Sequence, residues 1–140
     1  MVVPHHPRGA GEARGRIAAR LAPLVRPELL TDALSVAAEL VGNAVRHANA
    51  LPGNVIRVAW RLRLAPGTET VEVRVTDGGA TTEPSVRPPD TDSTDGRGLS
   101  IVAALADDWG VDRDGGGQSV WAEITWPSER RTTTAAGVAD

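Results

Sequence analysis

The segment from about Thr31 to Ala48 constrains the fold most, because it carries the clearest helical periodicity in the sequence. Thr31 or a near neighbour is expected to cap this helix, with Asp32 in the first turn, where the helix dipole favours a negative charge. Asn49 follows the last turn and is expected to end it. The apolar stripe consists of Leu34, Ala37, Val41, Ala44, Val45 and Ala48.

The segments around this helix predict the remaining architecture. A shorter helix is expected before it, and two alternating segments after it read as strands joined by a hairpin. The expected elements are helices at 12–25 and 99–106, and strands at 55–64, 71–76, 109–111 and 119–126. This order predicts an α+β fold, a two-layer sandwich whose mixed, largely antiparallel sheet is covered on one face by about three helices.

The expected domain extends from residue 12 to residue 127. Residues 1–11 are expected to form a flexible N-terminal tail, with at most a short strand at Val2 and Val3, and residues 128–140 a disordered C-terminal tail. The pair His5 and His6 is interpreted as part of the first tail. The proline-rich segment 80–97 is too long for a routine connection and is expected to act as a lid.

Composition excludes several classes of function. The chain has no cysteine, which rules out disulfides and thiolate metal sites. Its net charge is −3 and its basic residues, all arginine, are dispersed, so direct nucleic-acid binding is not expected. Neither a signal peptide nor a membrane-spanning segment is visible, which predicts a cytoplasmic location.

Polar side chains interrupt the central helix at regular spacing. Glu39 and Asn43 are four residues apart and therefore share a face, and Arg46 and His47 extend it by a turn. A carboxylate, a carboxamide and a guanidinium on one face suit a Mg²⁺-phosphate ligand. The alternative is a solvated polar face, with His47 near the negative end of the helix dipole.

Two glycine-containing segments follow. Asp77, Gly78 and Gly79 end a strand, and the alternative interpretation is an ordinary Asp-Gly turn. The segment 95–99, Asp-Gly-Arg-Gly-Leu, opens a helix. Glycines there let backbone N–H groups approach a phosphate, although a flexible loop end would look the same.

In their order and spacing, these three segments resemble the N, G1 and G2 boxes of the Bergerat (GHKL) ATP-binding fold. The resemblance covers about residues 12–126. The pattern Glu-Leu-x-x-Asn-Ala-x-x-His-Ala and the later Gly-Gly-x-Ser-Val-Trp-Ala-Glu-Ile look like the stand-alone anti-sigma-factor serine/threonine kinases. Sensor histidine kinases resemble the chain less, because none of these 140 residues is expected to form a dimerisation helix bearing a phospho-acceptor histidine.

The resemblance implies roles for individual residues. Asn43 would ligate Mg²⁺, Glu39 would act as general base or orient the attacking hydroxyl, and Asp77 would accept a hydrogen bond from the adenine amino group. Ser119 would help to bind adenine through water. The residues implied to bind ATP are Asn43, Arg46, His47, Asp77, Gly79, Gly96, Arg97, Gly98, Leu99 and Ser119.

The resemblance also implies partners and leaves alternatives open. A kinase of this group would transfer the γ-phosphate to an anti-anti-sigma protein and would also sequester a sigma factor; a homodimer stays open. The family's second box usually ends in glycine where this chain has Thr81, and the lid contains no lysine. The alternative is therefore a nucleotide-binding sequestering module without phosphotransfer.

Other conspicuous residues have structural interpretations. The four tryptophans, Trp60, Trp109, Trp121 and Trp126, are expected in the core or at the rim of the sheet. The arginines of the first long strand are expected on its solvated face, with a partner surface as the less favoured option. They are Arg57, Arg61 and Arg63.

Overall fold

The structure is a computed structural model that describes residues 1–79 and 97–127. The lid expected from residue 80, with Thr81 and Gly96, and the tail expected from residue 128 lie outside these ranges.

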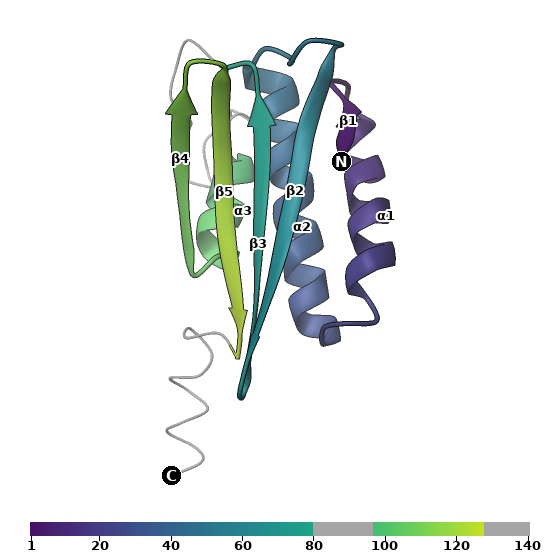
Figure 1. The fold of residues 1–140 in the computed structure, drawn as a ribbon, viewed down its shortest axis with the longest axis vertical. Coiled ribbons are helices and arrows are strands. Elements are labelled where there is room, and N and C mark those ends of the chain that lie inside the picture. Colours follow the sequence, from purple (N-terminus) through teal and green to yellow (C-terminus); the bar gives the residue numbers. More distant parts are fainter. Residues whose placement is uncertain (80–96, 128–140) are drawn as a thin grey trace.

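Five strands and three helices make up the described chain, and all strand pairs are antiparallel in the order β1-β2-β3-β5-β4. Figure 1 shows the helices on one face of the sheet. The elements are β1 (Val2–Pro4), α1 (Gly9–Leu21), α2 (Pro27–His47), β2 (Val55–Ala65), β3 (Thr68–Asp77), α3 (Arg97–Leu105), β4 (Asp108–Asp114) and β5 (Gly117–Trp126). The α+β sandwich is confirmed, and the described sheet is wholly antiparallel rather than mixed.

The core lies between the helices and the inner face of the sheet. Alternate residues of β3 and β5 point inward, as strand geometry requires, and a buried stripe of α2 faces them. Burying each large aliphatic side chain contributes about 1.5–3 kcal/mol. The expected stripe positions Ala37, Val41 and Ala44 are buried, whereas Leu34 and Val45 are half-buried at its edge.

Helix α2 begins earlier than expected, at Pro27 instead of near Thr31. Proline is tolerated in the first turn, since the N–H it lacks would have no partner within the helix. Asp32 therefore lies one turn inside the helix, where it is 8% exposed. The indole Nε1–H of Trp126 donates to its Oδ2 at 3.2 Å. This hydrogen bond links α2 to β5 and gives the buried Asp32 carboxylate a donor.

The N-terminal residues are also folded, in contrast to the flexible tail expected for residues 1–11. Val3 is 1% exposed in the core, and β1 pairs with the start of β2. Helix α1 begins at Gly9, where an added Cβ would contact the carbonyl oxygen of Pro4. This close approach lets the chain turn from β1 directly into α1, so the folded domain begins before residue 12.

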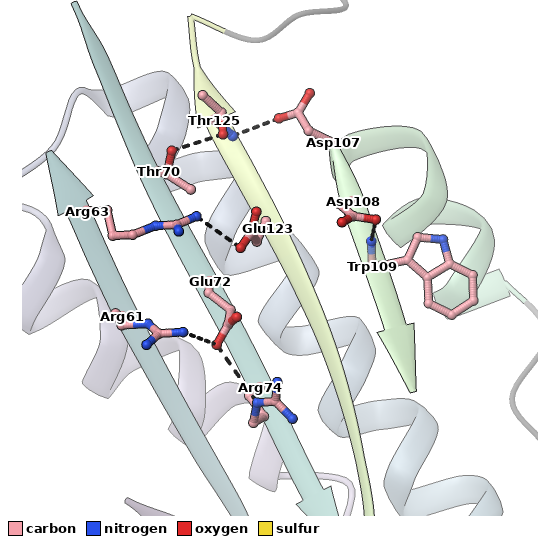
Figure 2. Close-up of polar contacts among 10 residues, drawn as sticks. All are labelled: Arg61, Arg63, Thr70, Glu72, Arg74, Asp107, Asp108, Trp109, Glu123 and Thr125. Carbon is pink, nitrogen blue, oxygen red and sulfur yellow. Dashed lines mark hydrogen bonds and ion pairs between the residues drawn. The ribbon is translucent and has the colours of Figure 1, made fainter. Parts of the chain in front are cut away.

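The outer face of the sheet is polar. Figure 2 shows Arg61 of β2 reaching Glu72 on the adjacent strand β3, and Arg63 reaching across β3 to Glu123 on β5. The N···O distances of these two ion pairs are 3.5 and 3.0 Å. Arg57 is exposed on the same face, which confirms the expected solvated side of β2. Such exposed ion pairs contribute about 0–1 kcal/mol each, so they keep this face soluble more than they stabilise the fold.

Three of the four tryptophans lie at the rim of the core, as expected, and Trp121 does not. All are half-buried, and Trp60, Trp109 and Trp126 pack against the inner core. Trp121 lies on the outer face, where its ring crowds Gly110 so closely that an added Cβ would come within 2.8 Å. Within the described ranges, no helix is long and apolar enough to cross a membrane.

Candidate functional site

The most unusual polar group is the carboxylate of Asp77, the last residue of β3. It continues the inward-facing series of that strand and is only 2% exposed. Burial raises its pKa above the ordinary value, and the backbone N–H of Gly79 and the charge of His5 oppose that shift. The Gly79 N–H donates to Oδ1 at 2.7 Å. No other described residue donates a hydrogen bond to this carboxylate, so one oxygen keeps its accepting capacity.

The turn after β3 is held against the end of α2. The N–H of Gly78 donates to the Asn49 carbonyl at 2.7 Å, and the Asn49 N–H donates to the Gly79 carbonyl at 2.9 Å. A Cβ on Gly78 would contact the Ala50 carbonyl oxygen, so only glycine fits there. Gly79 has φ of +93°, which also favours glycine. Both glycines thus help to hold Asp77 in position.

Gln118 accompanies Asp77 on the inner face. It is its register partner on β5, is 4% exposed and accepts a hydrogen bond from Arg113 Nε at 3.1 Å. Its carboxamide is oriented by this bond and can both donate and accept. A second buried polar side chain therefore lies at the strand end.

Ser119 lies elsewhere than expected. Its hydroxyl is bonded to that of Thr76 at 2.7 Å, and both residues belong to the half-buried series of their strands. Successive strand residues face opposite sides of a sheet, so Ser119 is on the outer face and Asp77 on the inner one. Gln118, not Ser119, therefore lies beside Asp77 on the inner face, and the water-mediated adenine contact expected of Ser119 stays a prediction.

The polar residues of α2 differ strongly in exposure. Asn43 is 7% exposed and Glu39, one turn earlier, is half-buried. Arg46 and His47 are exposed in the last turn, and a Cβ on Gly42 would lie 3.1 Å from Arg46 Nη1. The arginine side chain thus folds back over the glycine. Helix α2 therefore presents a carboxamide and a carboxylate toward the interior and a cation at its rim.

The third predicted segment opens α3. Arg97 and Gly98 are its first two residues, so their backbone N–H groups lie at the positive end of the helix. Leu99 follows and is 1% exposed, which makes its side chain part of the core. Gly96 is outside the described residues. The structure thus places Asp77 and Gly79 at the end of β3 and Arg97–Leu99 at the start of α3.

Two residues near Asp77 escaped the sequence interpretation. His5 was assigned to a tail, but its Nε2 lies 2.8 Å from the carbonyl oxygen of Ala48, at the end of α2. Gln118 carried a detectable signal, because the alternation that places Val120 and Ala122 inward also places residue 118 inward. No comparable pattern marks His5, whose position depends on the pairing of β1.

The residues of this site fit a Mg²⁺ ion that is coordinated mainly by phosphate and water oxygens and by few protein side chains. Among the described residues, no group of three or more His, Asp or Glu side chains could hold a metal ion. Mg²⁺ often takes one or two protein oxygens and completes its shell with phosphates and water. The carboxamide oxygen of Asn43 is an oxygen donor of the required kind, and no described residue hydrogen-bonds to it.

Comparisons with known proteins identify the family of the chain. The model of the histidine kinase-like ATPase domain family matches residues 3–124. None of the curated proteins compared with the chain matches it. A similar solved structure is the histidine kinase domain from the Erythrobacter litoralis EL346 blue-light activated histidine kinase, with 22% identity, a TM-score of 0.49, and coverage of 89% of this chain and 63% of that one. Because the family model matches most of its length, the chain belongs to the histidine kinase-like ATPase domain family, which binds ATP.

Proposed function

We propose that this domain binds Mg·ATP between α2 and the inner face of the sheet and transfers the γ-phosphate to a serine or threonine of a partner protein. The observation that carries the nucleotide site is Asp77. It is a carboxylate 2% exposed, with Oδ1 held by the Gly79 N–H and accepting capacity left on the other oxygen. Such a group suits the exocyclic amine of adenine.

The same group supplies base specificity. Guanine carries a carbonyl oxygen where adenine carries its amine, and that oxygen would face a carboxylate in a site of low dielectric. With guanine bound, the buried Asp77 carboxylate would have no donor for its second oxygen, which is costly in free energy. The site therefore discriminates against guanine. The turn at Gly78, fixed against Ala50, keeps the carboxylate in place for this recognition.

The α2 residues suit the phosphate end. Bound Mg·ATP would supply the phosphoryl group and neutralise much of the charge that develops during transfer. Asn43 would hold the cation through its carboxamide oxygen. Glu39, half-buried one turn away, would accept the proton of the attacking hydroxyl or orient it. Arg46, exposed at the rim, would face the phosphates.

The proposed partner class is that of partner-switching regulators: a sigma factor that is sequestered and an anti-anti-sigma protein that is phosphorylated. Support comes from the family assignment and from the two sequence patterns described above, around Asn43 and Ser119. The alternative is that the domain binds nucleotide and sequesters a partner without phosphotransfer. Thr81, which replaces a usual glycine, favours this second option.

One paired experiment tests the proposal. Calorimetry would measure Mg·ATP affinity, and γ-labelled ATP with mass spectrometry would follow transfer to candidate partner proteins. We expect Glu39→Ala to keep its affinity and lose about 10²–10⁴-fold in transfer, the usual range for a general base. Asn43→Ala should lose both. The matched control is Glu28→Ala, an exposed glutamate in the first turn of the same helix, which should change neither.

The outcomes separate the two options. If the wild-type protein binds ATP but phosphorylates none of the partners it captures, the kinase proposal is wrong and the sequestering module takes its place. Wild-type protein that does not bind ATP would contradict both.

A further inference from the structure

The edge of the sheet formed by β2 is only partly covered. Strand β2 extends from Val55 to Ala65, but β1 pairs with its first three residues alone. One more bonded pair follows, in which the N–H of Val58 donates to the Met1 carbonyl at 2.9 Å and the Met1 ammonium to the Val58 carbonyl at 3.0 Å. Beyond Val58, no described residue pairs with this edge. Figure 1 shows β2 continuing well past β1.

The register shows which backbone groups are exposed at this edge. In an antiparallel strand, alternate residues direct their N–H and C=O to opposite neighbours. Val58 directs its groups toward the edge, so Trp60, Leu62 and Leu64 do the same, while Arg61 and Arg63 bond to β3. Three consecutive edge positions can therefore each donate and accept a hydrogen bond. Such a row is a template for an added strand.

The side chains along this edge have two characters. On the inner side, Trp60 and Leu62 are half-buried, and Leu64 is 66% exposed. On the outer side, Arg61 and Arg63 pair with Glu72 and Glu123 in the free protein, but both side chains stay exposed and can turn toward an added strand. Helix α1 adds positive charge, because Arg16 and Arg20 line a hollow of about 280 Å³ together with Met1 and Trp60.

We propose that this edge is a docking site for an extended segment of a partner protein in which acidic and apolar residues alternate. Added as a strand, such a segment would bond to Trp60, Leu62 and Leu64 through its backbone, the mode known as β-augmentation. Its apolar side chains would pack beside Leu62 and Leu64. Its carboxylates would lie on the outer side, opposite Arg61 and Arg63.

Charge excludes a second copy of the chain as the favoured occupant. If two β2 edges paired antiparallel about Leu62, Arg61 of each copy would lie directly opposite Arg63 of the other. Like charges in directly opposite cross-strand positions are destabilising. An acidic segment converts both contacts into favourable ones. This inference does not depend on the nucleotide site, because Asp77 lies on β3 and the test is made without nucleotide.

The test uses two synthetic probes, the blocked peptides Thr-Val-Glu-Val-Glu-Val-Thr and Thr-Val-Lys-Val-Lys-Val-Thr. Amide hydrogen exchange by NMR would follow each position of β2 in the full chain. In the free protein, the amides of residues 60, 62 and 64 should exchange fast and those of 61 and 63 slowly. The glutamate peptide should slow the first set and leave the second unchanged. The lysine peptide should have no effect.

Variants locate the contact. Leu64→Pro removes one edge N–H and should abolish binding, whereas Leu64→Thr keeps that N–H and should retain most of it. Replacing Arg61 and Arg63 together by Gln should weaken binding about three- to tenfold. The matched control is Arg57→Gln, on the same face but where β1 already covers the edge, and it should change nothing.

Three results would overturn the proposal. The first is a lack of protection at residues 60, 62 and 64 with millimolar glutamate peptide. The second is equal binding of the lysine peptide. The third is protection of the same amides in peptide-free protein that disappears on dilution together with a dimer in sedimentation, which would make a second copy the occupant.

Discussion

Asp77→Asn is the sharpest perturbation of the proposed nucleotide site, because it keeps the shape of the side chain and removes its charge. The Gly79 N–H donates to Oδ1 at 2.7 Å, so the asparagine carbonyl must occupy that position to keep the bond. The NH₂ group then faces the ligand, donor against donor with the adenine amine. The flipped amide instead turns its NH₂ toward the Gly79 N–H. Either orientation loses one hydrogen bond.

The expected magnitude follows from this geometry. A hydrogen bond to a charged group contributes about 1.5–3 kcal/mol, and every 1.4 kcal/mol is about tenfold in affinity. We therefore expect Asp77→Asn to weaken Mg·ATP binding about ten- to a hundredfold in calorimetry, and to reduce the preference for ATP over GTP. The matched control is Asp32→Asn, another buried carboxylate, which contacts Trp126 at the other end of α2 and should leave affinity unchanged.

The same variant should act differently on stability. Burial raises the pKa of Asp77 in the folded state, so the folded protein holds this proton more tightly than the unfolded chain does. Its contribution to stability is therefore present at low pH and is lost as pH rises from the unfolded value through the folded pKa. Asp77→Asn removes this loss. Urea unfolding should show a flatter dependence of stability on acidic pH, and stability at neutral pH no lower than that of the wild type.

Two results would refute this reasoning. Equal affinity of wild type and Asp77→Asn for ATP would remove Asp77 from the nucleotide site. An unchanged pH dependence of stability would show that burial of this carboxylate has no energetic cost in the folded protein.

Further substitutions test the elements that support the site. Gly78→Ala should lower the free energy of unfolding by about 1–3 kcal/mol and weaken ATP binding, because its Cβ would meet the Ala50 carbonyl; unchanged values would show that the turn can move without cost. Gly15→Ala should raise the free energy of unfolding by about 1 kcal/mol, since this position in α1 is exposed and a Cβ there meets nothing within 4 Å; urea titration showing a loss would contradict that geometry. Trp126→Phe should cost about 1–2 kcal/mol by removing the indole donor of Asp32, and thermal unfolding at the wild-type temperature would exclude this bond as a stabilising one.

The central helix and the long strands were predictable because local periodicity determines them. The stripe around Val41 and the alternation of Val71, Val73 and Val75 correspond to buried positions. The predicted start of α2 was wrong because Pro27 was interpreted as a break, although the first turn of a helix accepts proline. Both the periodic patterns and the start of α2 depend on residues that are close together in the sequence.

The N-terminal region could not be predicted in the same way. The short strand allowed for at Val2 and Val3 is present as β1, but its order comes from pairing with β2, more than fifty residues away, which no local pattern predicts. Val3 gains a place in the core only through that pairing. His5 consequently reaches the Ala48 carbonyl at the end of α2, a contact that no local sequence pattern predicts.

The candidate site shows the same division between local and distant causes. An Asp-Gly-Gly sequence after a strand indicates a turn, and nothing local tells whether its carboxylate is solvated. Here two close approaches bury it: Gly78 lies against the Ala50 carbonyl at the end of α2, and a Cβ on Gly117 would contact the carbonyl oxygen of Asp77 itself. A side chain at either glycine would separate β3 from its neighbours and admit water to Asp77. The chemistry of this carboxylate thus depends on glycines nearly forty residues apart in sequence, one beside it and one at the start of β5, and only the folded sheet brings them together.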